Sequence, residues 1–588
     1  MRQALSRAWL GLVLVGFIAS GCAQLNVDGR PYAVVSSHYH ATEAGLEVLE
    51  AGGTAADAAI AVAAMLSVVE PWFSSVLGGG TWALYYEAET GRVTSLDGVG
   101  PIGSLASVED YGSRAAEPGL HQSVVPGAWD GWMLWLDAYG VKELPELLAP
   151  AIERARAGYF LSGPMSAWLD REANLIAERP DTARIYLREG RVLNYGDTVY
   201  QLDLADTLTD LADAYDAARP LGRSQAIQAA RDHVYRGPIA QAVVSASNAG
   251  GGYLTLEDFA SFEAAIVSPI DIVYSEGVRV YQNPPNSQGI TQLLAMNTLK
   301  AMDLGSLEPT DSLAVHLQVE ALKLAFADRH VHVGDPARVD VPVEALLSDE
   351  HAARQRNRIA EDRALSWPTA SGLSSPAMNL QGRERSEVGV EAVPGLDVAT
   401  GTTTFHIVDR WGNAAAVTTS LGAQFLVIGD TGIHINNRMR FTALDEGDPN
   451  RLTPGFKVRH TSNPYLVMRE GEPYILGGNT GADTQSQGQV QQALRVLEFG
   501  ASAQEAISAP RFVSTGFPAT TYPYAVAGQL QLERGWPEAT VRGLVELGHD
   551  VVVGRGIFGT AHMLVVMEGE IDVGADPDYA TSSGLSQR

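Results

Sequence analysis

The chain has 588 residues, and its composition of 46% hydrophobic and 19% charged residues is typical of a folded globular protein rather than a disordered one. It carries 41 basic and 69 acidic side chains, a net charge of −28. That balance argues against the clustered positive charge with which proteins bind nucleic acid or anionic lipid surfaces, so we expect no nucleic-acid partner. The only cysteine is Cys22, which excludes internal disulfides.

The N-terminus has the layout of an export signal. Arg2 and Arg7 precede an apolar run over residues 9–18, which is too short to span a membrane, and small residues follow up to Cys22. The sequence ASGC resembles a bacterial lipobox, in which the cysteine is diacylated and becomes the mature N-terminus. We interpret residues 1–21 as a lipoprotein-type signal peptide and Cys22 as a lipidation site. This predicts an exported lipoprotein with a lipid anchor on the periplasmic side of a membrane, which we take to be the outer membrane. The alternative is an ordinary signal peptide followed by an incidental cysteine.

Strands and helices alternate in the next segment. A helix with Thr42 as its predicted N-cap is followed by a second helix that begins at Thr54, in capping-box spacing with Asp57, and ends before Pro71. The apolar stretch of this second helix, residues 58–69, is shorter than a bilayer requires. It therefore predicts a buried helix of the core.

The middle of the chain, from about residue 120 to 270, has mostly helical periodicity. Residues 364–400 break the pattern, because they are rich in Ser, Pro and Gly and show little periodicity, and we interpret them as a linker. Strand, turn and strand are expected over residues 402–420. Thr402 thus stands at the first position of a predicted sheet, directly after a linker that ends at Gly401.

Several enzyme motifs are absent from the sequence. It has no GxSxG nucleophile elbow, no phosphate-binding GxxxxGK[ST] loop and no HExxH zinc helix. His38 and His40 have no third ligand nearby in the sequence, so we interpret them as structural rather than metal-binding. We expect neither a metal nor any other cofactor.

The run Thr402-Thr403-Thr404 has two interpretations. Threonine is β-branched, so an ordinary strand explains it. The position after a linker suggests a second explanation. If the peptide bond between Gly401 and Thr402 were cut, Thr402 would carry an α-amine, with a pKa of about 7.7, beside its own hydroxyl. The amine can act as general base for that hydroxyl, so nucleophile and base would belong to one residue.

Nine blocks of sequence stand in the order of one enzyme family. They are SSHYHATEAGLEVLEAGGTAADAAIAVAAMLSVVEP, LGGGTWALYY, VPGAWDGW, GGYLTLEDFASF, PPNSQGI, VEALKLAFADRHVHVGDP, TTTFHIVDRWGNAAAVTTS, GIHINNRM and SAPRF. Together they resemble the gamma-glutamyltranspeptidase family of N-terminal-nucleophile hydrolases, from about residue 31 to the C-terminus. The resemblance implies an α/β fold, a four-layer αββα sandwich built from two self-cleaved fragments. Residues 22–401, with the linker 364–401 at their end, would form the large fragment and residues 402–588 the small one, held together as an intramolecular heterodimer.

The resemblance also implies the chemistry and the residues that perform it. A small-molecule amide acylates the threonine, and water or an amine acceptor then takes the acyl group. Thr402 is the implied nucleophile, while Thr418 and Ser420 match the hydroxyl pair on the partner strand, where Ser420 orients the Thr402 hydroxyl. The alternative is that both are ordinary strand residues. Gly481 and Ala482 match a Gly-Gly turn whose backbone N–H groups form the oxyanion hole, and alanine preserves these donors unless the turn needs a positive φ there.

The substrate pocket departs from the family pattern. Asp97 stands where the family has an arginine for the substrate's α-carboxylate. Arg438 replaces a glutamine, and the aspartate for the α-amino group is missing. His460 and Thr461 replace a serine pair, and a shortened loop predicts that a lid over the site is missing. We assign substrate binding to Arg438, His460 and Thr461.

Three functions are compatible with these residues. The lead interpretation is a self-processing gamma-glutamyltransferase-like amidohydrolase or acyltransferase that acts on a gamma-glutamyl, glutathione-type, or related acyl group. Arg438, with Arg459 nearby, suits a carboxylate on an acyl group without an α-amine, which favours a dicarboxylic monoamide, as in the glutaryl-type acylases of the same superfamily. Either arginine can instead form an ordinary ion pair. From another class, the alternative is a non-catalytic ligand-binding lipoprotein.

Overall fold

The computed structural model describes residues 30–366, 401–422, 425–522, 524, 526–554 and 558–587. The expected signal peptide, Cys22 and most of the expected linker lie outside the described residues. No helix in the described part of the chain combines the length and the apolar character needed to cross a membrane.

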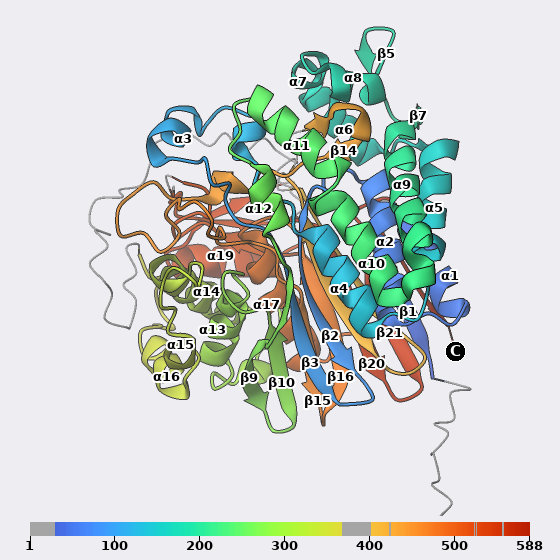
Figure 1. Cartoon of the computed structure of the whole chain (residues 1–588). Coiled ribbons are helices and arrows are strands. Elements are labelled where there is room, and N and C mark those ends of the chain that lie inside the picture. Colours follow the sequence, from blue (N-terminus) through green and yellow to red (C-terminus); the bar gives the residue numbers. More distant parts are fainter. Residues whose placement is uncertain are drawn as a thin grey trace, which may run out of the picture.

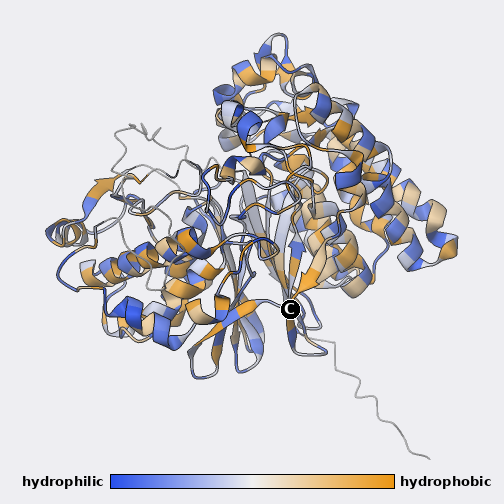
Figure 2. Cartoon of the chain, turned by 60° about the vertical axis from the view of Figure 1, so that its left-hand side comes forward, coloured by the Kyte–Doolittle hydropathy of each residue, from blue (hydrophilic) through white to orange (hydrophobic). Residues whose placement is uncertain are grey.

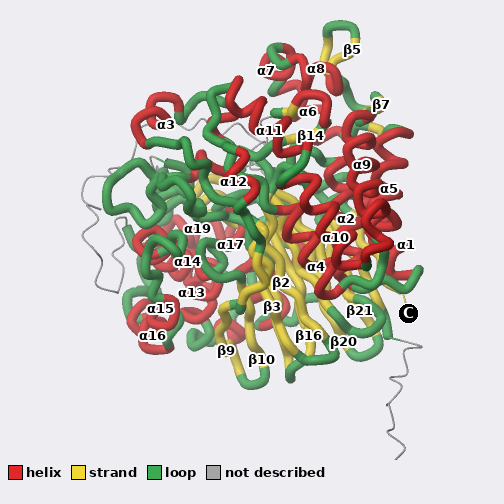
Figure 3. The backbone as a smooth tube through the Cα atoms, viewed as in Figure 1, coloured by secondary structure: helices red, strands yellow, loops and turns green. Residues whose placement is uncertain are grey.

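Two antiparallel β-sheets stacked face to face form the centre of the molecule (Figures 1 and 3). The first sheet has the strand order β22 (Ser583–Gln587), β1 (Tyr32–Ser36), β11 (Thr402–Val408), β12 (Ala414–Ser420), β2 (Gly80–Glu87), β3 (Arg92–Gly98) and β8 (Ala265–Val267). The second has the order β21 (Glu570–Ala575), β20 (Ala561–Met567), β16 (Glu472–Asn479), β15 (Tyr465–Arg469), β10 (Val278–Gln282) and β9 (Ile270–Ser275).

Helices cover the outer face of each sheet (Figure 1). Those over the first sheet are α1 (Tyr39–Glu50), α2 (Ala55–Val69), α4 (Ala128–Tyr139), α5 (Leu144–Ala157), α9 (Leu202–Ala218) and α10 (Arg223–Tyr235). Those over the second are α13 (Ile290–Leu299), α14 (Ser312–His332), α17 (Thr484–Leu497), α18 (Ala503–Ser508) and α19 (Glu538–Glu546). The expected four-layer αββα architecture is confirmed.

The described residues also form shorter helices and short strands, and these strands pair in small sheets apart from the two central ones. The helices are α3 (Val108–Arg114), α6 (Gly163–Arg171), α7 (Ala173–Ala177), α8 (Pro180–Tyr186), α11 (Pro238–Ala249), α12 (Leu256–Ala260), α15 (Val343–Leu346) and α16 (Asp349–Arg356). The strands are β4 (Tyr159–Phe160), β5 (Leu187–Arg188), β6 (Arg191–Val192), β7 (Thr198–Val199), β13 (Val427–Ile428), β14 (Ile433–His434), β17 (Phe512–Ser514), β18 (Gln529–Leu532) and β19 (Asp550–Val553).

Buried apolar residues fill all three interfaces between the four layers. Helix α2 is the most deeply placed helix of the first layer: all 15 of its residues are buried, and the predicted capping box of Thr54 and Asp57 is present. The helices at the surface of the molecule instead carry both hydrophobic and hydrophilic residues (Figure 2). The predicted N-cap Thr42 is wrong. Helix α1 begins earlier, at Tyr39, because the ring of His38 accepts a hydrogen bond from the backbone N–H of His40 and caps the helix.

Strand β11 sends alternate side chains into different interfaces. Phe405 and Ile407 pack in the core beneath the helices, whereas Val408 packs between the sheets. Since side chains alternate along a strand, Thr402 and Thr404 face the space between the sheets, and Thr403 faces the helices.

Candidate active site

Thr402 and Ser420 face each other at the end of a β-hairpin. Thr402 is the first residue of β11 and pairs with Ser420, the last residue of β12. Their hydroxyl oxygens lie 2.8 Å apart, so the hydrogen bond implied by the family resemblance is present. Asp409 holds the far end of the hairpin, where its carboxylate accepts bonds from the backbone N–H groups of Trp411 and Asn413, each at 2.9 Å.

The carbonyl group of Gly401 is held by three donors. The backbone N–H groups of Leu421 and Gly422 lie 2.9 and 3.0 Å from its oxygen, and the Ser420 hydroxyl lies 3.1 Å away. Gly401 has a φ of +54°, and a Cβ atom there would come within 2.5 Å of the Gly422 backbone. A glycine is therefore required at this position, immediately before Thr402.

Thr418 lies two residues along the hairpin from this pair, opposite Thr404. Its hydroxyl is 3.3 Å from that of Thr404, which also donates to the carbonyl oxygen of Val417 at 2.8 Å. The second sheet packs directly on this point, because a Cβ atom at Gly478 would come within 2.1 Å of the Thr404 hydroxyl. Thr418 therefore supports Thr404, and it is Ser420 that bonds to Thr402.

The turn after β16 presents backbone N–H groups. Gly481 and Ala482 have φ values of +100° and +49°, and their N–H groups donate to no group within the described part of the chain. The turn therefore does need a positive φ at residue 482, which costs a non-glycine residue about 1–2 kcal/mol, so Ala482 is strained. Ala482 nevertheless adopts this conformation, and its N–H group stays available as a donor.

Gln288 and Arg329, which the sequence did not indicate as site residues, fix this turn. The Gln288 amide donates to the carbonyl oxygens of Ala482 at 3.0 Å and Thr461 at 3.2 Å. Arg329 donates to the Gln288 side-chain oxygen at 2.8 Å and pairs with Asp483. Gln288 belongs to the block PPNSQGI, which contributed to the family resemblance but carried no predicted role.

Arg438 brings a buried positive charge next to Ser420. Its guanidinium donates to the Ser420 hydroxyl at 2.8 Å and to the Asn437 side-chain oxygen at 2.9 Å, and it lies 4.9 Å from the centre of the Phe441 ring. Burial, with a contribution from Arg440, lowers the pKa of Arg438 to about 9. The guanidinium is therefore still charged at neutral pH.

Arg438 and His460 line a small cavity of about 10 Å³, about the room that one water needs, beside Ser420. The Nδ1 atom of His460 accepts a bond from the Ser462 backbone N–H at 3.2 Å, so its Nε2 atom carries the proton. That atom has no partner among the described residues, and a Cβ atom at Gly80 would lie 3.5 Å from it. Burial keeps the pKa of His460 well below its usual range. The cavity therefore offers a cation and a neutral N–H donor.

Other predicted pocket residues lie elsewhere. Thr461 is buried but does not line the cavity. Arg459 points toward the carbonyl oxygens of Arg329 and Val333 at the end of α14, at 3.4 and 3.3 Å, so it does not reach the cavity as the sequence suggested. Asp97 forms an ion pair with Lys457 at 2.6 Å.

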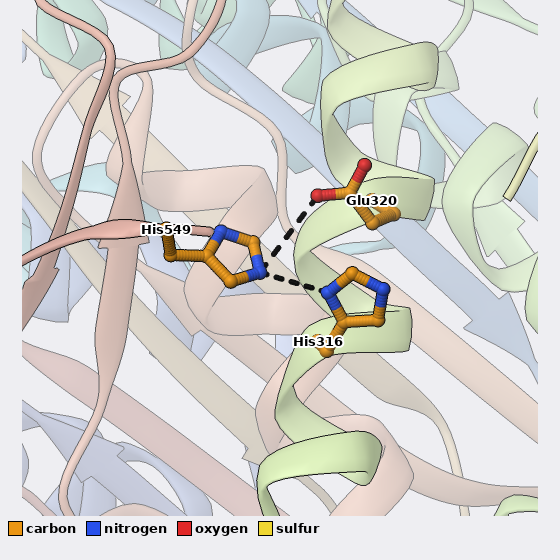
Figure 4. A group of neighbouring side chains, drawn as sticks. All are labelled: His316, Glu320 and His549. Carbon is orange, nitrogen blue, oxygen red and sulfur yellow. Dashed lines mark hydrogen bonds and ion pairs between the residues drawn. The ribbon is translucent and has the colours of Figure 1, made fainter. Parts of the chain in front are cut away.

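His316, Glu320 and His549 form the one group in the described residues with metal-ligand geometry (Figure 4). The two rings bond to each other at 2.8 Å, and Glu320 pairs with Lys323 at 2.7 Å. The second nitrogen of His316 lies 2.8 Å from the Ala360 carbonyl oxygen. Since a lysine ammonium already neutralises the carboxylate and both histidines are hydrogen-bonded, we interpret the group as a structural network.

Known proteins share both sequence and fold with this chain. Residues 41–584 match the family model described as Gamma-glutamyltranspeptidase. The chain is 34% identical over 564 residues to the glutathione hydrolase-like YwrD proenzyme of Bacillus subtilis strain 168, covering 94% of this chain and 98% of that relative. It is 28% identical over 531 residues to the oxamate amidohydrolase proenzyme of Klebsiella pneumoniae, with coverage of 88% and 91%. The solved structure of the cephalosporin acylase from Bacillus halodurans aligns with a TM-score of 0.79 at 27% identity, covering 100% of this chain and 99% of that one. The chain therefore belongs to the gamma-glutamyltranspeptidase family.

Proposed function

We propose that the chain is a self-cleaving amidohydrolase or acyltransferase whose nucleophile is Thr402. One observation carries this proposal. At the residue that follows the expected linker, a threonine hydroxyl bonds to Ser420 while the preceding carbonyl group, that of Gly401, is held by three hydrogen-bond donors. A ligand-binding scaffold has no use for this arrangement, whereas an enzyme with an N-terminal nucleophile depends on it.

The same geometry suits self-cleavage. The Thr402 hydroxyl oxygen attacks the Gly401 carbonyl carbon, and the three donors stabilise the negative charge that develops on the carbonyl oxygen. Ser420 accepts the hydrogen bond of the attacking hydroxyl. As the carbon–nitrogen bond breaks, the hydroxyl proton passes to the Thr402 nitrogen, which leaves an ester. Water then hydrolyses the ester and releases a Gly401 carboxylate and a Thr402 α-amine.

Turnover then uses the new amine as base. It takes the proton from the Thr402 hydroxyl, which attacks the carbonyl carbon of the amide substrate. The N–H groups of Gly481 and Ala482 are the donors proposed for the resulting oxyanion, since they are free of other partners within the described residues. The leaving amine takes the proton, and water or an amine acceptor then removes the acyl group from Thr402.

Arg438 and His460 favour an acyl group that carries a carboxylate. A guanidinium and an N–H donor line the same small cavity, whose volume of about 10 Å³ has room for one carboxylate oxygen in place of a water, and Arg438 is only two hydrogen bonds from the Thr402 hydroxyl. This spacing favours a short dicarboxylic monoamide. The relatives named above include a glutathione hydrolase-like protein and an oxamate amidohydrolase, which differ in their acyl groups, so the choice of substrate rests on Arg438 and His460.

A panel of amides tests the proposal. The purified protein should hydrolyse oxamate, succinamate or glutaramate, and Thr402→Ala should abolish the reaction. Arg438→Gln should lower kcat/KM for these substrates by about 10- to 100-fold, since a charge-assisted hydrogen bond is lost. The matched control is Arg459→Gln, which removes a buried guanidinium outside the cavity and should affect kcat/KM less. Preferred hydrolysis of a gamma-glutamyl anilide, lost when its α-amine is acylated, would overturn this specificity.

We also propose that the protein is exported and lipid-anchored through Cys22. The support is the sequence of residues 1–22 alone. In a bacterial host, the wild-type protein should fractionate with membranes, and Cys22→Ala should move it to the soluble fraction. Equal membrane association of both would contradict the anchor.

A further inference from the structure

Thr403, the neighbour of the proposed nucleophile, is joined to a buried carboxyl group through a chain of hydrogen bonds. Its hydroxyl oxygen lies 2.7 Å from that of Ser37, which donates to Glu70 at 2.5 Å. The Tyr579 hydroxyl donates to the other Glu70 oxygen at 2.9 Å. Either hydroxyl can be the donor in the bond between Thr403 and Ser37. All four side chains are buried.

Four separate segments meet at this chain of bonds. Thr403 comes from β11, Ser37 follows β1, Glu70 ends α2 and Tyr579 precedes β22. On the opposite face of β11, the Thr404 hydroxyl donates to the Val417 carbonyl oxygen at 2.8 Å. The beginning of β11 is therefore held by side chains on both faces.

Self-cleavage removes one of the links that hold the start of β11. In the uncut chain, Thr402 is tethered to Gly401, whose carbonyl oxygen bonds to Leu421 and Gly422. After the cut, Thr402 is a chain end. The bonds to the Gly401 carbonyl oxygen no longer hold Thr402, because Gly401 then belongs to the other fragment. Chain ends fray unless they are tied down. A frayed end would move the amine and hydroxyl of Thr402 away from Ser420.

We propose that Thr403, Ser37 and Glu70 are positioning residues that hold the cut end of β11 in the first sheet. This inference rests on the proposed function, since only a cut chain needs such an anchor. It also assigns a separate task to each threonine of the run: Thr402 reacts, Thr403 anchors the strand on its helix-facing side, and Thr404 anchors it to β12 on the side that faces the second sheet.

The surroundings of Glu70 suit this role. The groups that face it are the hydroxyls of Ser37, Tyr579 and Thr403, and Tyr159 lies close enough to interact with its charge. No lysine or arginine of the described residues forms an ion pair with it. The Glu70 carboxyl group is therefore stabilised by these hydroxyl groups. No cation in the described part of the chain competes with Ser37 for it, so the hydrogen bonds that connect it to Thr403 are kept.

The test compares variants that each lose one buried hydroxyl group on the helix-facing side of the first sheet. Thr403→Val and Ser37→Ala should lower kcat by about 10- to 100-fold, because small misplacements of a nucleophile have effects of that size. KM should change less than twofold, and Thr403→Ser should restore kcat. The matched control is Thr81→Val, which removes a buried hydroxyl that bonds to Thr419 at 3.0 Å and not to β11.

A readout independent of activity is hydrogen exchange of the amides of residues 404–406. In the cut protein, Thr403→Val should exchange faster there than wild type. In the uncut background of Thr402→Ala, the same substitution should have a smaller effect. If wild-type protein neither cuts itself nor hydrolyses amides, both proposals are overturned. If it does both, and Thr403→Val matches Thr81→Val in kcat and in exchange, the anchor alone is overturned.

Discussion

At the scale of a single residue, Glu70 makes the stability of the folded state depend on pH. Burial raises the pKa of its carboxyl group from 4.5 to about 7, although hydrogen bonds from Ser37 and Tyr579 act in the opposite direction. The folded state therefore holds a proton that the unfolded chain releases more readily. The stability that this proton contributes is fully present below about pH 4.5, and it is lost as the pH rises through about 7.

The expected effect is measured against Glu70→Gln, which keeps the shape and removes the titration. The free energy of unfolding of the parent, relative to that variant, should fall by about 3 kcal/mol as the pH rises across this window. This free energy is measured by denaturant unfolding of both proteins in the Thr402→Ala background, where the protein remains one uncut chain. A difference between parent and variant that does not change with pH would contradict the buried, titrating carboxyl.

At the scale of elements, the β11–β12 hairpin determines how closely the sheets approach. Gly478 of β16 lies against Thr404, with room for no side chain. Gly478→Ala should push the sheets apart at the site and slow both self-cleavage and amide hydrolysis by at least about tenfold, since catalytic geometry tolerates little displacement. The matched control is Gly554→Ala, because Gly554 has nothing within 4 Å of an added Cβ atom. Equal rates in the two variants would contradict this packing.

The same hairpin shows what the sequence could predict. Its strands follow from local patterns, as does the capping box of α2, and both are present. The Thr402–Ser420 hydrogen bond, which joins residues 18 positions apart, was implied only by the family resemblance, and it is also present. The predicted start of α1 is wrong because histidine is an uncommon N-cap, and here its ring nitrogen accepts the capping hydrogen bond in place of the Thr42 hydroxyl. Local residue types suffice where the partner is a few positions away.

Partners that are distant in sequence could not be predicted in this way. Ser37 and Thr403 are 366 positions apart, and Gln288 and Ala482 are 194 apart. For Arg459, nearness in sequence gave a wrong prediction. Its neighbours Val458 and His460 both line the cavity, yet the Arg459 side chain points to the end of α14. Adjacent positions can serve different sites, and only the fold determines which.

At the scale of the whole molecule, the two proposed fragments share both sheets. Residues 402–588 supply β11, β12 and β22 to the first sheet and β15, β16, β20 and β21 to the second, while the remaining strands precede the cut. Separation would expose both cores and leave strand edges unpaired. The fragments should therefore elute as one particle in native size-exclusion chromatography and separate only in denaturant. Separate native peaks would contradict the interleaved fold.

The measurement that tests the central claim most directly is the denatured mass of the purified protein with N-terminal sequencing, beside Thr402→Ala. We expect two fragments from the wild-type protein, the smaller beginning Thr-Thr-Thr-Phe, and a single chain from the variant. A wild-type chain that stays intact while its fold is preserved would contradict the assignment of Thr402 as a nucleophile released by self-cleavage.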